Sequence, residues 1–337
     1  RRQAPRTLPG PCGRGRVCGA FCRNEVPMEL TDIAVIRRLC AAHGFSLSKG
    51  LGQNFIVNPG VCPKIVEASG IDETYGALEI GPGIGVLTKE LALRARKVVA
   101  IELDARLPAL LAETLAGFSN IRVVQGDALK LDLAALIRQE FPGMKVAVCA
   151  NLPYYITSPL VMKLLEDKLP LQHITVMVQK EAAQRLAALP GTREAGAVSY
   201  AVHYYARPQV LFQVQPGSFY PPPKVTSAVL RLSLHTAPPA APQSEKAMFR
   251  TIRAAFSQRR KTAANAVSAG LGLPKADVAA ALQAVGAPPA ARRNPALPLQ
   301  QDQGVQQIAV TGLQGPPGLL IGDCRVRAEL FHLFQSH

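Results

Sequence analysis

The chain of 337 residues has no apolar run that approaches the roughly 18 residues of a membrane-spanning helix. It also has no C-x-x-C pair, because its seven cysteines are scattered and no histidine lies close to them at metal-ligand spacing. These absences argue against a membrane-spanning protein and against a zinc site. We therefore expect no bound metal, no membrane partner, and reduced thiols in a cytoplasmic protein.

Negative charge is also scarce. The chain has 23 acidic residues against 38 lysines and arginines, which gives a net charge of +15. Such an excess on an otherwise ordinary globular composition indicates a polyanionic partner, and nucleic acid is the first candidate. The length predicts one sizeable domain and a smaller one.

Residues 77–88, ALEIGPGIGVLT, are typical of a buried strand, a glycine-rich turn and the start of a helix. The first four are apolar enough for an interior parallel strand, and Gly81, Gly83 and Gly85 leave the backbone open to a ligand. The dinucleotide fingerprint G-x-G-x-x-G fits poorly, because Thr88 occupies the third glycine position counted from Gly83 and a proline in the turn removes one amide. A ligand with ribose and adenine but no phosphates fits better, which favours S-adenosylmethionine.

Two acids stand at the ends of the next two predicted strands. Glu102 ends the strand 98–102, 21 residues after Gly81, where a carboxylate can accept hydrogen bonds from both ribose hydroxyls. Asp127 follows the strand 121–124, and an acid there can accept a hydrogen bond from the adenine amine. Either acid alone would be interpreted as a solvated strand end. Because ligands gather at the carboxyl edge of open α/β sheets, the two acids and the glycine turn together favour a binding site.

The fourth predicted strand, residues 145–150, leads into Asn151-Leu152-Pro153-Tyr154. Proline fixes the backbone, so the Asn151 side-chain oxygen and a neighbouring carbonyl can point at one spot with the tyrosine ring beside them. An exocyclic amine on a flat base would find two acceptors there and a ring on which to stack. In isolation the tetrapeptide would be interpreted as a turn with a packing tyrosine.

Seven motifs, in this order, resemble those of the ribosomal RNA adenine dimethyltransferases, and within that family most resemble the bacterial small-subunit enzymes. The motifs are GQNF (52–55), EIGPGIGVLT (79–88), IELD (101–104), GDAL (126–129), NLPY (151–154), QKE (179–181) and FYPPPKV (219–225). The resemblance covers about residues 46–290. It implies an α/β fold in which a Rossmann-like, seven-stranded class I methyltransferase sheet is followed by a small C-terminal α-helical domain.

The resemblance also implies an activity and a site. The enzyme would be a cytoplasmic monomer that uses S-adenosylmethionine to dimethylate two adjacent adenines in the 3′-terminal hairpin loop of small-subunit (16S) rRNA, in ribosome biogenesis. Carried over motif by motif, cofactor binding falls to Asn54, Ile56, Gly81, Gly83, Glu102, Asp127 and Asn151. The target adenine would lie between Tyr154 and Phe219, with Asn151 and the Leu152 carbonyl receiving its amine.

We expect a methyltransferase domain over residues 28–235, a Pro- and Ala-rich linker over 236–244 and a small helical RNA-binding domain over 245–290. One helix is predicted over 249–269. Its basic residues are expected to have no nearby acid, which favours contact with RNA phosphates. These residues are Arg253, Arg259, Arg260 and Lys261.

The two ends differ from the rest of the chain. Residues 1–27 hold six arginines against one acid, and we interpret them as a disordered or non-native extension before Met28. Thr31 is predicted to cap the first helix. Residues 291–337 are rich in Gln and Gly and do not follow the family, so we expect an atypical, irregular tail.

Other functions stay open at this point. A large-subunit rRNA adenine dimethyltransferase of the antibiotic-resistance type shares the motifs. A non-catalytic nucleic-acid-binding factor on the same fold is a second alternative, although the intact Asn151-Leu152-Pro153-Tyr154 and the cofactor acids argue against it. A dehydrogenase would have to bind nicotinamide.

Overall fold

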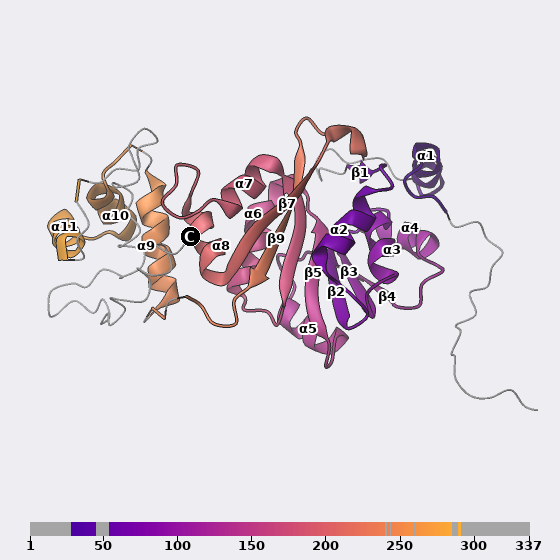
Figure 1. The fold of residues 1–337 in the computed structure, drawn as a ribbon, viewed down its shortest axis with the longest axis horizontal. Helices are drawn as coiled ribbons and strands as arrows, with labels where there is room; N and C mark the ends of the chain where they lie inside the picture. The colour runs from indigo at the N-terminus through magenta and orange to yellow at the C-terminus, as the bar shows by residue number, and fades with distance from the viewer. Residues whose placement is uncertain are drawn as a thin grey trace, which may run out of the picture.

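A computed structural model describes residues 28–44, 54–239, 241–242, 244–258, 260–284 and 289–290. Within these ranges a seven-stranded sheet forms the centre, in the order β4-β3-β2-β5-β6-β9-β7 (Figure 1). The strands are β2 (Tyr75–Ile80), β3 (Lys97–Glu102), β4 (Ile121–Gln125), β5 (Lys145–Asn151), β6 (His173–Gln179), β7 (Ala206–Val214) and β9 (Ser227–Leu234). Strands β2 to β6 are parallel, whereas β9 runs antiparallel to both of its neighbours. The α/β sheet predicted from the sequence is thus confirmed.

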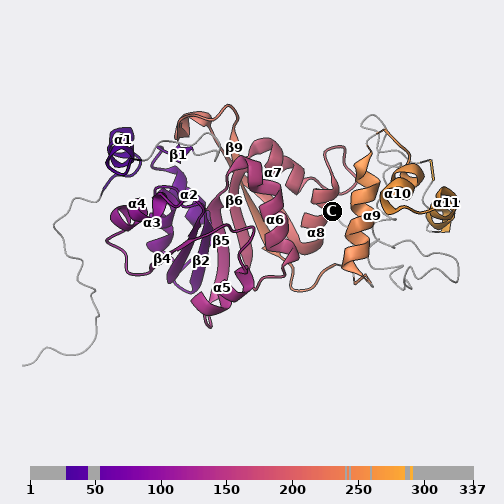
Figure 2. The ribbon, with the colours of Figure 1, turned by 180° about the vertical axis from the view of Figure 1, so that it is seen from behind.

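Helices cover both faces of the sheet (Figure 2). They are α2 (Val61–Ser69), α3 (Val86–Ala92), α4 (Leu107–Thr114), α5 (Leu133–Glu140), α6 (Thr157–Glu166), α7 (Lys180–Ala187) and α8 (Ala197–Tyr205). Helices α5, α6 and α7 pack on one face, and α2 and α3 pack on the other. None of the helices in the described part of the chain combines the length and the apolar character needed to cross a bilayer.

Successive side chains along a strand point to opposite faces of the sheet, and in this sheet both sets of side chains are covered by helices. In β2, Leu78 and Ile80 pack against α5 and α6, whereas Ala77 packs against α2 and α3. Strands buried on both sides read as nearly continuous apolar runs, which is the pattern of residues 77–80. The sheet therefore presents only its edges to a ligand, and the loops at the carboxyl edge can form a site.

One acid is buried in this framework away from the carboxyl edge. Glu140, at the end of α5, is 2% exposed and accepts from Lys97 Nζ at 2.9 Å and from Arg122 Nη1 at 2.6 Å. These two cations come from β3 and β4, so the acid ties the end of α5 to two neighbouring strands. The two cations thus compensate the charge of a carboxylate that lies in the interior.

The N-terminal part closes over the carboxyl edge of the sheet. Helix α1 (Ile33–Ala42) packs on α4 with Phe55 and Ile84. Strand β1 (Phe55–Ile56) pairs with β8 (Phe219–Tyr220), and this two-stranded sheet connects the start of the domain to the loop before β9. The cap predicted at Thr31 is wrong. Asp32 caps α1 through Ala34 N at 2.7 Å, whereas the Thr31 hydroxyl donates to Glu29.

The C-terminal helices lie at the end of the molecule opposite to α1 (Figure 1). They are α9 (Glu245–Ser257), α10 (Ala263–Leu271) and α11 (Lys275–Ala284). The single helix predicted over 249–269 is wrong, because the chain leaves the helix after Ser257 and Thr262 caps the next one through Asn265 N at 3.4 Å. Helix α9 packs against α8, where the Tyr204 and Phe249 rings meet edge to face at 5.3 Å. The linker predicted over residues 236–244, between the methyltransferase domain and the small helical domain, stays a prediction.

Candidate functional site

A pocket opens at the carboxyl edge of the parallel strands. It holds about 1110 Å³ of space, a volume that includes the open solvent at its mouth. Every residue predicted to bind the cofactor or the target adenine lines it. These are Asn54, Ile56, Gly81, Gly83, Glu102, Asp127, Asn151, Leu152, Tyr154 and Phe219. The structure thus brings together residues from six separate motifs, and their individual roles stay predictions.

The glycine turn between β2 and α3 forms one wall. Gly81 and Gly83 have φ angles of 73° and 59°, a left-handed conformation that side chains disfavour. Both glycines line the pocket, as the sequence predicts. Gly85 does not, because a Cβ there would lie 3.0 Å from the Leu115 side chain, inside the contact with α4. The expectation that Gly85 opens the backbone to a ligand is therefore wrong, and this glycine serves helix packing instead.

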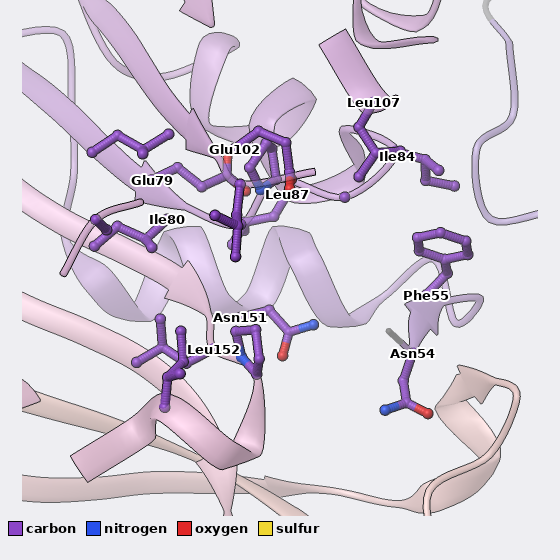
Figure 3. Close-up of a pocket in the computed structure, with 18 of the residues that line it drawn as sticks. Asn54, Phe55, Glu79, Ile80, Ile84, Leu87, Glu102, Leu107, Asn151 and Leu152 are labelled. Carbon is purple, nitrogen blue, oxygen red and sulfur yellow. The ribbon is translucent and has the colours of Figure 1, made fainter. Parts of the chain in front are cut away.

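Glu102 connects the glycine turn to the end of β3. Its Oε1 accepts from the Asp104 amide at 2.8 Å, and the Gly83 amide also donates to this carboxyl. The side chain is only 5% exposed, and burial raises its pKa above the ordinary value. Backbone donors therefore hold the carboxylate in place, and Figure 3 shows it on the pocket wall. A fixed carboxylate of this kind can accept from two adjacent hydroxyls.

Asp127 lies one strand further along the same edge. Its Oδ1 accepts from the Leu129 amide at 2.9 Å, and its other oxygen lies 3.6 Å from Lys130 Nζ. The side chain is 28% exposed, so one oxygen is accessible from the pocket mouth. This arrangement is compatible with a carboxylate that accepts from the amine of an adenine ring.

The end of β5 supplies the opposite wall. Figure 3 shows the Asn151 amide pointing into the pocket across from Glu102. The Leu152 amide donates to the Met177 carbonyl at 3.1 Å, which fixes the peptide that follows Asn151 against β6. Tyr154 begins the short helix η2 (Tyr154–Ile156), and its hydroxyl lies 2.8 Å from Ser227 Oγ on β9. Burial raises the pKa of Tyr154.

Two short strands position the remaining predicted residues. Ile56 pairs with Phe219 in the β1–β8 sheet, so the N-terminal motif and the Pro-rich loop line the pocket side by side. Phe219 lines the pocket but is only 4% exposed, because it packs in the core beside Val229. Asn54 lies just before β1, and Figure 3 shows its side chain on the same side of the pocket as Phe55.

Sequence reasoning missed Glu79. This acid stands in the middle of β2, is 1% exposed and lines the pocket, and its Oε2 has no hydrogen-bond partner in the described structure. Burial raises its pKa to about 8; the nearby Thr88 hydroxyl acts against this shift, and the Glu102 carboxylate adds to it. A single acid inside an otherwise apolar strand was the available signal, since buried carboxyls require a partner.

Leu103 was missed as well. It follows Glu102, lines the pocket and is 49% exposed, which is unusual for a large apolar side chain so close to the core. An exposed leucine at a pocket mouth offers a surface on which a flat ring can pack.

These features fit S-adenosylmethionine. The unpartnered Glu79 oxygen suits a ligand that carries positive charge, because a cation beside it would satisfy the buried carboxyl. Glu102 provides an acceptor for a ribose, and Leu103 provides an apolar face for a purine.

The basic residues predicted to bind RNA lie away from the pocket, among the C-terminal helices. Arg260 and Lys261 are exposed in the connection between α9 and α10. Arg253 lies on α9, and the expectation that no acid is near it is wrong, because its Nη1 is 3.8 Å from Glu166 Oε1 on α6. Arg259 lies outside the described residues, as do residues 1–27 and 291–337.

Comparisons with known proteins agree with the pocket. The family model of ribosomal RNA adenine dimethylase matches residues 44–282. Ribosomal RNA small subunit methyltransferase A of Geobacillus thermodenitrificans is 47% identical over 260 residues, which cover 76% of this chain and 89% of that protein. The protein of the same name from Alkaliphilus oremlandii is 44% identical over 234 residues, or 69% and 82% of the two chains.

Two solved structures are also similar. A dimethyladenosine transferase from Plasmodium falciparum has 26% sequence identity and a TM-score of 0.59, with 74% of this chain and 95% of that chain covered. The 23S rRNA methyltransferase ErmE has 27% identity and a TM-score of 0.56, with 75% and 99% covered.

Proposed function

The chain belongs to the ribosomal RNA adenine dimethylase family and is an S-adenosylmethionine-dependent methyltransferase, and from this premise we propose that it dimethylates two adjacent adenines near the 3′ end of small-subunit (16S) rRNA. The higher identity to small-subunit enzymes, 47% against 27% for the 23S rRNA enzyme, supports this substrate. The observation that carries the proposal is the convergence of Glu102, Asp127 and Asn151 on one pocket.

The pocket divides into a cofactor side and a base side. Glu102, on the cofactor side, would hold the ribose, Asp127 the adenine, and Glu79 the positively charged end. Asn54, Ile56 and the Gly81 to Gly83 turn would close around them. When bound, S-adenosylmethionine supplies an electrophilic methyl group on a positively charged sulfur.

The base side activates a poor nucleophile. The lone pair of an adenine amine is conjugated with the ring, so its nitrogen must become tetrahedral before it can attack. The Asn151 oxygen and the Leu152 carbonyl would accept both amine hydrogens and stabilise the positive charge that develops on the nitrogen. Tyr154 and Phe219 would hold the base in place.

No general base is required in this scheme. S-adenosylmethionine held by Glu79, Glu102 and Asp127 would supply the methyl group to the nitrogen, and its sulfur would keep the electron pair of the broken carbon–sulfur bond and leave as a neutral thioether. The nitrogen is then cationic and acidic, and its proton passes to water. The same geometry serves the second methyl group, because one hydrogen of the amine remains for one of the two acceptors.

The test is direct. Purified protein is incubated with unmethylated small subunits and labelled S-adenosylmethionine, and the modified bases are mapped. We expect label in two adjacent adenines near the 3′ end of 16S rRNA, whereas label in large-subunit particles would favour the antibiotic-resistance type of enzyme. Binding of small subunits without transfer would favour the non-catalytic alternative.

A variant tests the chemical role within this function. Asn151→Ala should lower methyl transfer about 100-fold, the scale of losing one oriented polar group at a developing charge. Near-normal turnover of this variant would reject the role of Asn151. We further propose that the enzyme acts as a monomer in the cytoplasm, which sedimentation of the purified protein and cell fractionation would test.

A further inference from the structure

The hydroxyl of Tyr154 is joined to a residue that no motif assigns to the site. Its Oη lies 2.8 Å from Oγ of Ser227, and 73 residues separate the two in sequence. Ser227 is the first residue of β9 and is 1% exposed. Because β9 runs antiparallel to β6, its start lies at the same edge of the sheet as the ends of the parallel strands.

Ser227 is a rigid anchor. It pairs with Gln179 of β6 on one side and with Val214 of β7 on the other, so neighbouring strands fix its backbone on both sides. Tyr154, in contrast, lies in a three-residue helix in which no residue is buried. The backbone of that helix is held by the Pro153 carbonyl, which accepts from the Ile156 amide at 3.2 Å.

Packing alone therefore leaves the Tyr154 ring only partly held. The hydrogen bond to Ser227 fixes the far end of the ring, while the η2 backbone fixes the near end. With both ends of its long axis held, the ring keeps one position at the pocket wall. A base that stacks on a ring held in this way loses less freedom on binding than one that must first order the ring.

We propose that Ser227 is a positioning residue for methyl transfer, which holds the Tyr154 ring where the target adenine stacks. The inference rests on the proposed function, since it concerns the base that Tyr154 receives. Ser227 does not touch the cofactor side of the pocket and is not among the residues that line it. Substitution of Ser227 should therefore change kcat/KM for the RNA substrate and leave the affinity for S-adenosylmethionine unchanged.

The test is a double-mutant cycle with Ser227→Ala and Tyr154→Phe. Each single substitution removes one of the two hydroxyls, and Tyr154→Phe keeps the aromatic face. We expect each to lower kcat/KM for unmethylated small subunits about five- to tenfold, the scale of one neutral hydrogen bond. The double variant should be no worse than either single variant, because both remove the same interaction. The dissociation constant of S-adenosylmethionine, measured by calorimetry, should stay unchanged in all three.

Two further variants complete the design. Ser227→Thr keeps a hydroxyl in a strand position that favours β-branched residues, and it should restore most of the activity. Ser233→Ala changes a serine at the other end of β9, roughly 20 Å away at the rise of a strand, and should leave kcat/KM unchanged. Thermal unfolding of every variant measures loss of folding separately from loss of transfer.

Several outcomes would overturn the assignment. Normal kcat/KM in Tyr154→Phe would show that the hydroxyl pair does not position the ring, whatever Ser227→Ala does to folding. Multiplying defects in the double variant, or weaker cofactor binding in Ser227→Ala, would also contradict it. If the wild type methylated large-subunit particles instead, the proposed substrate would be wrong, and the same cycle on that substrate would still decide the role of Ser227.

Discussion

Replacing Glu79 by glutamine should stabilise the ligand-free protein, by an amount that depends on pH. The pKa of this buried carboxyl is about 8 in the fold and near 4.5 in the unfolded chain. Between these values the folded chain keeps a proton that the unfolded chain releases, so stability falls as pH rises, by about 1.4 kcal/mol for each pH unit. From pH 4.5 to pH 7 the loss amounts to about 3 kcal/mol.

Glutamine is neutral throughout this pH range, so a protein with glutamine at this position does not lose this stability as the pH rises. Urea denaturation should therefore show Glu79→Gln to be more stable than the wild type by about 3 kcal/mol at pH 7, with the difference shrinking towards pH 4.5. Glu73→Gln is the matched control, since Glu73 is exposed just before β2. An equal difference at both pH values would refute the reasoning, because it would then come from packing and not from a buried proton.

The same substitution should weaken cofactor binding. Glutamine cannot offer a negative charge to a cationic ligand, so we expect the dissociation constant of S-adenosylmethionine to rise about tenfold or more. In the wild type, binding near pH 7 should release a proton, which calorimetry in buffers of different ionisation enthalpy detects. A gain in stability together with a loss of affinity is the pattern of a residue kept for function.

Three other predictions follow from the described structure. The double substitution Arg260→Glu and Lys261→Glu should weaken binding of the small subunit at least tenfold at low salt, and should make that binding less dependent on salt concentration. Unchanged binding would reject a contact between these residues and RNA phosphates. Glu140→Ala should lower the free energy of unfolding by about 1 kcal/mol in a urea titration, since it removes two ion pairs whose cations are partly exposed to solvent, and an unchanged free energy would contradict that account. Burial, and to a lesser degree the charge of Arg231, lower the pKa of His173 to about 4, so the stability of the fold should decrease as the pH drops from 6.5 towards 4. In a pH series of thermal unfolding, His173→Gln should flatten that decrease.

Strands β3, β4 and β5 could be predicted because each is a short, largely apolar run that ends in a polar residue. The predicted strand 98–102 ends at the residue where β3 ends, and the glycine turn follows β2 as expected. Since carboxyl ends of parallel strands share one edge, the positions of Glu102 and Asp127 followed from the order of the motifs.

Other features could not be predicted from local patterns. The break between α9 and α10 lies in a stretch of Gln, Arg and Lys, which are good helix formers, and only Thr262 signals a new start. At the start of α1, Thr31 and Asp32 are both good caps, and the choice depends on the bond from Thr31 to Glu29. The contact between Tyr154 and Ser227 depends on strand order, which no single segment encodes.

Because of the order and direction of the strands, substitutions on the cofactor side and on the base side that we propose for the pocket fall on different strands. Glu79 and Glu102 lie on the parallel strands β2 and β3, and Asp127 follows β4, which places all three on the proposed cofactor side of the pocket. Ser227 lies beside the proposed base side only because β9 runs in the opposite direction. A fully parallel sheet would place the end of that strand at the pocket and its start at the far edge. We therefore expect substitutions on the three parallel strands to change cofactor affinity first, and a substitution at the start of β9 to change transfer to RNA first.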